Sequence, residues 1–121
     1  MSYYLAIDIG ASSGRHILGS IEDGKIKLEE IYRFENGISK IGDEYCWDIQ
    51  GLFNEIKKGI KKCKEIGKVP KTIGIDTWAV DFVLLDENDE MLGNVVAYRD
   101  DRTEGYMEKA FKVIPQDMLY L

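Results

Sequence analysis

A short segment rich in glycine and serine, AIDIGASSGR, has the residue types of a phosphate-binding loop. Small residues let a backbone approach a ligand closely, hydroxyl groups donate hydrogen bonds, and a guanidinium matches the oxygens of a phosphate. Together these groups could bind a nucleotide through its phosphates. The candidate phosphate ligands are Ala11, Ser12, Ser13, Gly14 and Arg15.

We expect this loop to connect two antiparallel strands, because the segment after it, HILGSIEDG, is typical of a strand and a hairpin turn. No lysine follows Gly14, so the Walker pattern GxxxxGK[ST] is absent, and GxGxxG is absent as well. The phosphate would then be held by loop N–H groups, serine hydroxyls and Arg15, without a helix dipole. The plainer alternative is a polar hairpin with capping serines.

Asp8 ends an apolar run directly before the loop, where an ionised carboxylate needs a compensating partner. A Mg²⁺ ion, held directly or through water, would compensate Asp8 and would also neutralise a bound nucleotide. Hydrogen bonds from loop N–H groups are the alternative. Asp76 ends a second apolar run, TIGID, so we expect the two carboxylates on adjacent strands, where Asp76 could share the metal or contact a substrate.

The segment DTWAVDF is a candidate sugar-binding segment, with Asp76 and Asp81 on either side of Trp78. Sugar hydroxyls favour charged acceptors, and the C–H face of a sugar packs on an aromatic ring. A core tryptophan and an exposed aspartate are the alternatives. In YRDDRT, we expect Arg99 and Arg102 to form loop ion pairs rather than to bind an anion. His16 has no visible acid–base partner and is expected to be structural.

The elements that position these residues follow from hydrophobic periodicity. We predict three antiparallel strands in succession, with a bulge near Glu30, and then a helix that Asp48 caps and Gly67 ends. The lysines on the outer face of this helix are expected to be solvated. We predict ENGISKIGDEYC to be a connecting loop. The predicted strands cover residues 4–9, 15–21, 25–34, 72–76, 80–85 and 91–97, and a final helix carries Met107, Ala110, Phe111 and Ile114.

Composition limits the partners. The chain of 121 residues is about one small domain, and its net charge of −6 argues against nucleic acid as a partner. Two widely spaced cysteines do not form a zinc site, and neither a signal peptide nor a spanning segment is visible, so we expect a cytoplasmic protein that binds no membrane. The final segment FKVIPQDMLYL lacks a polar terminus, so we expect a longer chain.

The motifs DIGASSGR, IGIDTWAVDFVLLD and AYRDDRT, in this order and spacing, resemble the amino-terminal part of the FGGY carbohydrate kinases, and most closely their rhamnulokinase branch. The resemblance spans nearly the whole chain. It implies an α/β, ribonuclease H-like fold of the actin and hexokinase kind, with a mixed sheet. Residues 1–121 would then be the amino-terminal part of the first kinase domain, and the second, adenosine-binding domain would lie outside them.

The same resemblance implies transfer of a phosphoryl group from ATP to the 1-hydroxyl of L-rhamnulose, with Mg²⁺. The loop from Ala11 to Arg15 would then hold the ATP phosphates, Asp8 would face the metal, and Ala79 would occupy a sugar-contacting position that is glycine in familiar members. The catalytic base would lie beyond Leu121, so these residues alone would be nearly inactive. Other readings are kinase activity on another ketose, a metal-dependent nuclease using Asp8 and Asp76, and a non-catalytic sensor or assembly module.

Overall fold

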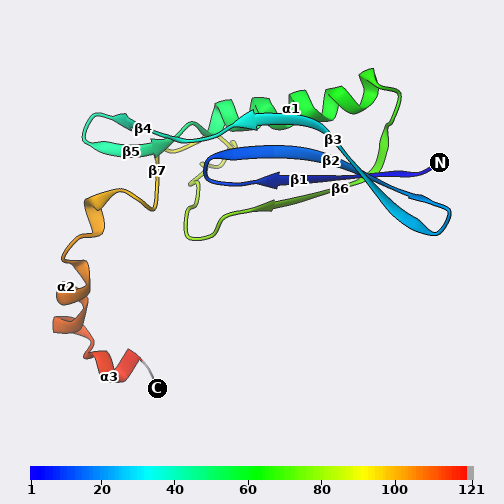
Figure 1. Ribbon diagram of the computed structural model, residues 1–121. Helices are drawn as coiled ribbons and strands as arrows, with labels where there is room; N and C mark the ends of the chain where they lie inside the picture. The colour runs from blue at the N-terminus through cyan, green and yellow to red at the C-terminus, as the bar shows by residue number, and fades with distance from the viewer. Residues whose placement is uncertain (120–121) are drawn as a thin grey trace.

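A four-stranded mixed sheet forms the centre of the computed structural model, which describes residues 1–119 (Figure 1). Its strand order is β3-β2-β1-β6. The three strands that come first, β1 (Tyr3–Ile9), β2 (Ser13–Glu22) and β3 (Lys25–Glu35), are antiparallel neighbours, and β6 (Pro70–Thr77) pairs with β1 in parallel. The predicted order of strands is therefore confirmed, and so is the adjacency of the two strands that end in aspartate.

The predicted bulge in β3 is also confirmed. His16 pairs with Tyr32, but the next residue of β2, Ile17, pairs with Glu30, so Ile31 has no partner of its own. An extra residue on one strand of an antiparallel pair shifts the side chains that follow to the other face of the sheet. This explains why the apolar alternation of β3 changes phase at this point.

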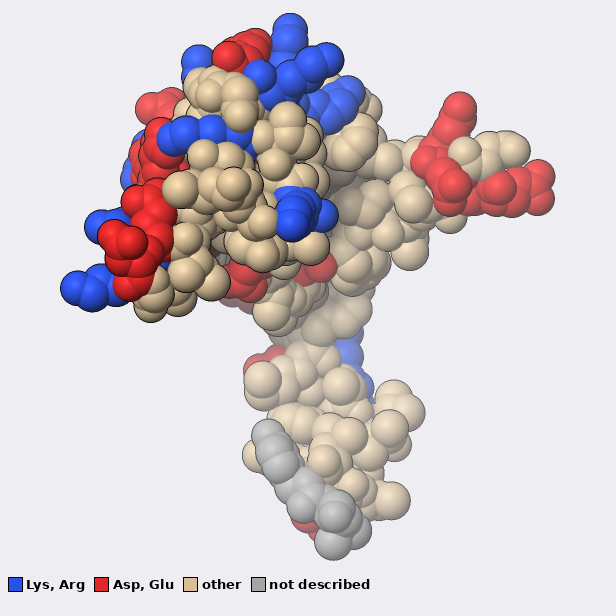
Figure 2. Space-filling model, turned by 90° about the vertical axis from the view of Figure 1, so that its right-hand side faces the viewer, with Lys and Arg blue, Asp and Glu red and all other residues tan. Residues whose placement is uncertain are grey.

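The long helix α1 (Ile49–Glu65) covers one face of the sheet (Figure 1). Asp48 caps it as predicted, because its carboxylate accepts a hydrogen bond from Gly51 N at 2.8 Å. Lysines gather with the helix at the top of Figure 2, as expected of a solvated face. The apolar stripe of α1 packs on side chains from the first three strands, which gives a core of Leu5, Ile7, Ile9, Leu18, Phe34, Leu52, Ile56, Ile60 and Cys63.

A second, three-stranded sheet contradicts the prediction of a connecting loop over ENGISKIGDEYC. This segment contains β4 (Ile38–Ile41) and most of β5 (Glu44–Trp47), and β7 (Val95–Val96) pairs with β5. Gly42 makes the hairpin turn with a φ of 61°. The missed signal was the Gly-Asp turn between two short runs, each with isoleucine or aromatic residues.

The predicted strands over residues 80–85 and 91–97 are largely wrong. The structure has a single bridge between Leu85 and Met91, and of the second stretch only β7 is a strand. Val80 has a φ of 72°, which interrupts extended backbone at the start of the first stretch, and Asp89 has a φ of 62° within the turn. A two-stranded ribbon that no third strand extends is marginal, so the apolar alternation alone did not produce a hairpin.

The carboxyl-terminal elements extend away from the sheet (Figure 1). They are the short helix η1 (Asp101–Thr103), α2 (Tyr106–Val113) and α3 (Gln116–Leu119). The predicted final helix is confirmed as α2, although its apolar side chains remain largely exposed. Among the helices of residues 1–119, none has the length and hydrophobicity needed to cross a bilayer.

Candidate functional site

Four charged side chains, one from each strand, lie in one row across the sheet at the end where β1 and β6 stop. Arg33 on β3 is in register with Arg15 on β2. Asp8 is in register with Arg15 on β2 and with Asp76 on β6. Residues that are paired in this way share a face, and α1 covers the opposite face because Ile7 and Ile9 belong to the core. The row therefore lies on the face that α1 leaves open. Adjacent strands are about 5 Å apart, so the two carboxylates are close neighbours.

Arg15 forms an ion pair with Asp8. Its Nε and Nη2 both donate to Asp8 Oδ2, each at 3.0 Å, and each side chain is 45% exposed. Arg15, rather than loop N–H groups, is therefore the partner of this carboxylate. Asp8 Oδ1 accepts no hydrogen bond within residues 1–119, and neither does the carboxylate of Asp76. One oxygen of Asp8 and both oxygens of Asp76 are therefore without a hydrogen-bond donor among residues 1–119.

Hydrogen bonds from outside the loop fix the shape of the predicted phosphate loop. Gly10 N donates to Ser13 O at 2.9 Å, and Asn36 N donates to Ser12 O at the same distance. Asn36 Nδ2 donates to Gly10 O at 2.9 Å. The hydroxyls of both serines, and the N–H groups of Ala11 and Ser12, have no acceptor in the part of the chain that the structure describes. The loop is therefore held by its carbonyls, and its donors are free for an anion.

Asn36 is a site residue that the sequence analysis missed. It lies 26 residues from Gly10 in the chain, and only the antiparallel pairing of β2 with β3 brings its side chain to the loop. The Asn-Gly pair at Asn36 and Gly37 marked the end of a strand, which was the available signal. Gly14 is required for a different reason, because a Cβ atom there would lie 2.1 Å from Phe34 Cζ.

Asp81 accepts hydrogen bonds from two tryptophans. Trp47 Nε1 donates to Asp81 Oδ2 at 2.6 Å, and Trp78 Nε1 donates to the same oxygen at 2.9 Å. The two indole rings pack with their centroids 4.4 Å apart. These residues line an apolar cavity of about 200 Å³. Trp47, which the sequence analysis missed, is thus the buried anchor of the predicted sugar segment.

The backbone between the two anchored side chains is strained. Val80 has a φ of 72°, which costs energy for a β-branched residue and persists only where its surroundings hold it. Asp81 and Trp78 supply that restraint on either side. Ala79 lies between them and is exposed. Of the predicted sugar contacts, the structure groups Trp78, Ala79 and Asp81 in this loop, whereas Asp76 lies in the charged row.

The segment after β7 does not form the predicted ion pairs, because neither Arg99 nor Arg102 is within salt-bridge distance of a carboxylate in residues 1–119. Asp100 instead accepts hydrogen bonds from Tyr45 N at 2.7 Å and from Arg102 N at 2.8 Å. These two N–H donors lower the pKa of Asp100. A buried carboxylate thus fixes this segment against β5.

His16 faces away from the charged row and is structural, as expected. The ring is buried under α1, and its Nε2 lies 3.2 Å from the carbonyl oxygen of Ile56. Burial lowers the pKa of His16, although that carbonyl and nearby Glu55 oppose the shift. The imidazole is therefore a neutral core group.

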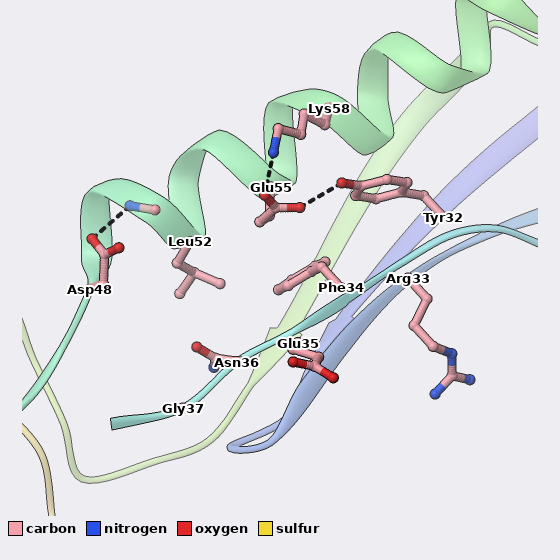
Figure 3. A pocket seen from close by; sticks show the side chains of 11 residues that line it. Tyr32, Arg33, Phe34, Glu35, Asn36, Gly37, Asp48, Leu52, Glu55 and Lys58 are labelled. Atoms are coloured by element: carbon pink, nitrogen blue, oxygen red, sulfur yellow. Dashed lines mark hydrogen bonds and ion pairs between the residues drawn. The ribbon is translucent and has the colours of Figure 1, made fainter. Parts of the chain in front are cut away.

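A wider hollow of about 560 Å³ lies between the end of β3 and the first turns of α1 (Figure 3). Glu55 accepts hydrogen bonds from Tyr32 Oη and from Lys58 Nζ, each at 2.5 Å. Figure 3 shows Arg33 on the other side of β3, pointing away from the helix. Arg33 pairs there with Glu30 at 2.7 Å. On the helix side of the hollow, Glu55 is thus paired with Lys58, whereas Arg33 lies on the face of the charged row.

A mixed sheet with three antiparallel strands first, and a polar loop between the first two, defines the class of fold to which this chain belongs. The ligand-bound xylulose kinase from Lactobacillus acidophilus has the same arrangement, with a TM-score of 0.78 at 16% identity over 99% of this chain and 24% of that chain. That likeness confirms the predicted fold class, the ribonuclease H-like fold of actin and hexokinase.

The chain belongs to the FGGY family of carbohydrate kinases, because the amino-terminal domain of that family matches residues 3–120. A rhamnulokinase from Halalkalibacterium halodurans is 55% identical over 121 residues, which are 100% of this chain and 26% of that protein. A rhamnulokinase from Oceanobacillus iheyensis is 53% identical over 117 residues, which are 97% of this chain and 25% of that protein. The chain thus spans about a quarter of the length of these relatives.

Proposed function

We propose that this chain forms the phosphate-binding part of an ATP-dependent kinase that phosphorylates the 1-hydroxyl of L-rhamnulose. The observation that carries the proposal is the register of Asp8 with Asp76 beside the free donors of the loop. In open α/β sheets, ligands bind beyond the carboxyl ends of the strands, which is where this row lies. The two rhamnulokinases described above support the choice of sugar.

The residues of the row fit Mg²⁺ as a partner of the nucleotide. Mg²⁺ prefers oxygen ligands and usually keeps several waters, so one or two carboxylates and the phosphates of the substrate suffice to hold it. No group of three or more metal-ligating side chains occurs in residues 1–119, but the free oxygens of Asp8 and Asp76 meet that smaller requirement. When bound, the ion would neutralise charge on the phosphates.

The chain's own groups would position the ATP phosphates. The N–H groups of Ala11 and Ser12 and the serine hydroxyls would donate to the phosphate oxygens, and Arg15 would add a charge-assisted bond. Phosphoryl transfer depends mainly on positioning and on stabilisation of charge, so a rigid loop is useful. Asn36, which fixes the loop through Gly10 and Ser12, acts as a positioning residue.

The sugar would lie near the loop that the two tryptophans hold. In this proposal Ala79 contacts the ketose through its backbone, and the ring of Trp78 offers an apolar surface to the C–H face of the sugar. Asp81 and Asp76 remain candidates for its hydroxyls, Asp81 through the oxygen that neither indole contacts. The catalytic base and the adenosine pocket would come from residues outside these 121, and the free thiols of Cys46 and Cys63 fit a cytoplasmic location.

The test is a kinase assay on the full-length protein that contains these residues, with L-rhamnulose, L-fuculose, D-xylulose and L-ribulose. We expect kcat/KM to be highest for L-rhamnulose, and a higher value for another ketose would contradict the assignment. Arg15→Ala should lower kcat/KM for ATP by about 100-fold. Lys62→Ala is the control and should leave activity unchanged, because Lys62 lies on α1, on the opposite side of the sheet from the row, where it pairs with Glu65 at 3.6 Å. Equal activity of the two variants would refute the role of Arg15.

A further inference from the structure

Arg99 lines the same cavity as the predicted phosphate loop, although it follows that loop by more than 80 residues. The cavity has a volume of about 260 Å³, and its walls include Ala11, Ser12, Trp47 and Arg99. We propose that Arg99 contacts the phosphoryl group while it moves from ATP to the sugar. This inference rests on the proposed function and adds a residue to it.

The guanidinium of Arg99 is held at one edge and free at the other. Its Nε donates to Tyr98 Oη at 2.9 Å, and its central carbon lies 5.4 Å from the centroid of the Tyr98 ring. Both contacts restrict the side chain without neutralising its charge. Within residues 1–119 no carboxylate pairs with Arg99, so both Nη groups remain available as donors.

The backbone that carries Arg99 is fixed. Ala97 N donates to Tyr45 O at 2.7 Å, and Asp100 N donates to Ala97 O at 2.9 Å. The carboxylate of Asp100 accepts from Tyr45 N at 2.7 Å. These bonds attach the segment to β5 on both sides of the arginine. A cation on such a support can act on a neighbouring phosphate without first being ordered, which is the condition for stabilising a transition state.

Arg15 and Arg99 differ in what already neutralises them. Arg15 donates twice to Asp8, so part of its hydrogen-bonding capacity is in use before any ligand arrives. Arg99 has no such partner among the described residues. It lines one cavity together with Ala11 and Ser12 of the same loop. Arg15 thus suits a phosphate that stays with the nucleotide, and Arg99 suits the group that is transferred.

The chemistry of the transfer gives Arg99 a defined role. A bond forms between the 1-oxygen of the sugar and the γ-phosphorus, while the bond from that phosphorus to the oxygen of ADP breaks. The hydroxyl proton passes to the carboxylate base that the rest of the kinase supplies. Charge is spread over the three equatorial oxygens of the phosphoryl group at that moment, and a planar guanidinium stabilises such oxygens by charge-assisted hydrogen bonds. Arg99 gains and loses no proton.

The test compares Arg99→Gln, Arg99→Lys and the control Lys62→Gln, a surface position on α1, in the full-length kinase. We expect Arg99→Gln to lower kcat about 100-fold while KM for ATP and for the ketose stays within threefold. Arg99→Lys should recover part of the rate, and Lys62→Gln should match the unmodified protein. Titration with ADP, Mg²⁺ and aluminium fluoride in the presence of the ketose gives a second readout, because this mixture mimics the group in transfer.

Arg99→Gln should bind that mixture at least tenfold more weakly than the unmodified protein and should bind ADP alone equally well. A kcat within threefold of the unmodified value, or an unchanged affinity for the mixture, would overturn the role of Arg99 while leaving the proposed kinase activity in place. Failure of the unmodified full-length protein to phosphorylate any ketose would overturn both proposals. Thermal midpoints of all variants exclude loss of fold as the cause.

Discussion

The two faces of the four-stranded sheet have different tasks, although alternate residues of the same strands supply both. On β2, Arg15 points to the open face and joins the charged row, whereas the next residue, His16, is buried under α1. On β1, Asp8 lies between the buried residues Ile7 and Ile9. The covered face therefore determines the fold, and the open face carries the groups that can meet a ligand. A substitution on one of these strands therefore changes a side chain on either the covered face or the open face, and the two kinds of change can be compared.

The largest expected difference between the faces comes from two leucines. Leu18 is buried against α1, whereas Leu28 is 72% exposed on the open face. Leu18→Ala should lower the free energy of unfolding by about 3 kcal/mol, because it removes buried methyl groups and leaves a cavity. Leu28→Ala should change it by less than about 1 kcal/mol. Urea denaturation of both variants gives the comparison, and equal losses would show that the open face is covered in solution.

The next comparison uses two glycines. A Cβ atom at Gly59 on α1 would lie 2.3 Å from two atoms of the His16 ring, which is buried and has no room to move. Gly59→Ala should therefore cost about 2 kcal/mol, despite the higher helix propensity of alanine. At Gly19 the nearest atom would be Leu28 Cδ2 at 3.7 Å, an ordinary contact. Gly19→Ala should be neutral within about 0.5 kcal/mol, and thermal or urea unfolding measures both.

The buried imidazole predicts how stability depends on pH. Burial lowers the pKa of His16 below its ordinary value of 6.5, so near this value the unfolded chain binds more protons than the folded protein. The contribution of His16 is complete above pH 6.5 and is lost as the pH falls through the lowered pKa. The slope is at most about 1.4 kcal/mol per pH unit. The chain has one histidine, so His16→Gln should flatten urea-derived stability between pH 7 and 5. A slope that persists in His16→Gln would refute this assignment.

Much of the covered face could be predicted from the sequence, because it depends on long segments with a clear period. The predictions of a strand at β1, of a bulge in β3 and of an apolar stripe on α1 were all correct. The errors in secondary structure fell on residues 36–47 and 80–97, where strands are two to four residues long. Such short strands depend on which partner lies beside them, and periodicity does not contain that information.

The part of the candidate site that lies at the ends of β1 and β6 could be predicted from the sequence. Asp8 and Asp76 were predicted to lie on adjacent strands because each ends an apolar run, and the register of β1 with β6 confirms it. Asn36 and Trp47 were missed because each reaches its partner across 26 or 34 residues of chain. The ion pair of Asp8 with Arg15 was missed for another reason, since both residues had been given separate ligands. A carboxylate that can bind a cation and a guanidinium that can bind a phosphate can also form an ion pair with each other.

The smallest expected effect belongs to that pair on the open face. A double-mutant cycle with Asp8→Asn and Arg15→Gln should give a coupling free energy of at most about 1 kcal/mol, because both side chains are 45% exposed. The coupling should shrink further in 1 M salt, which screens exposed charges. A coupling above about 2 kcal/mol, measured by urea unfolding of the four proteins, would contradict the picture of an exchangeable pair.

A weak pair has a functional consequence for Arg15. Charge-assisted hydrogen bonds contribute about 1.5–3 kcal/mol each, more than the ion pair is expected to supply. A phosphate in the loop could therefore draw Arg15 away from Asp8 at little cost, which would also release Asp8 Oδ2 for a cation. Adding ATP with Mg²⁺ to the full-length protein should then reduce the measured coupling toward zero, and a coupling unchanged by saturating nucleotide would show that Arg15 stays on Asp8.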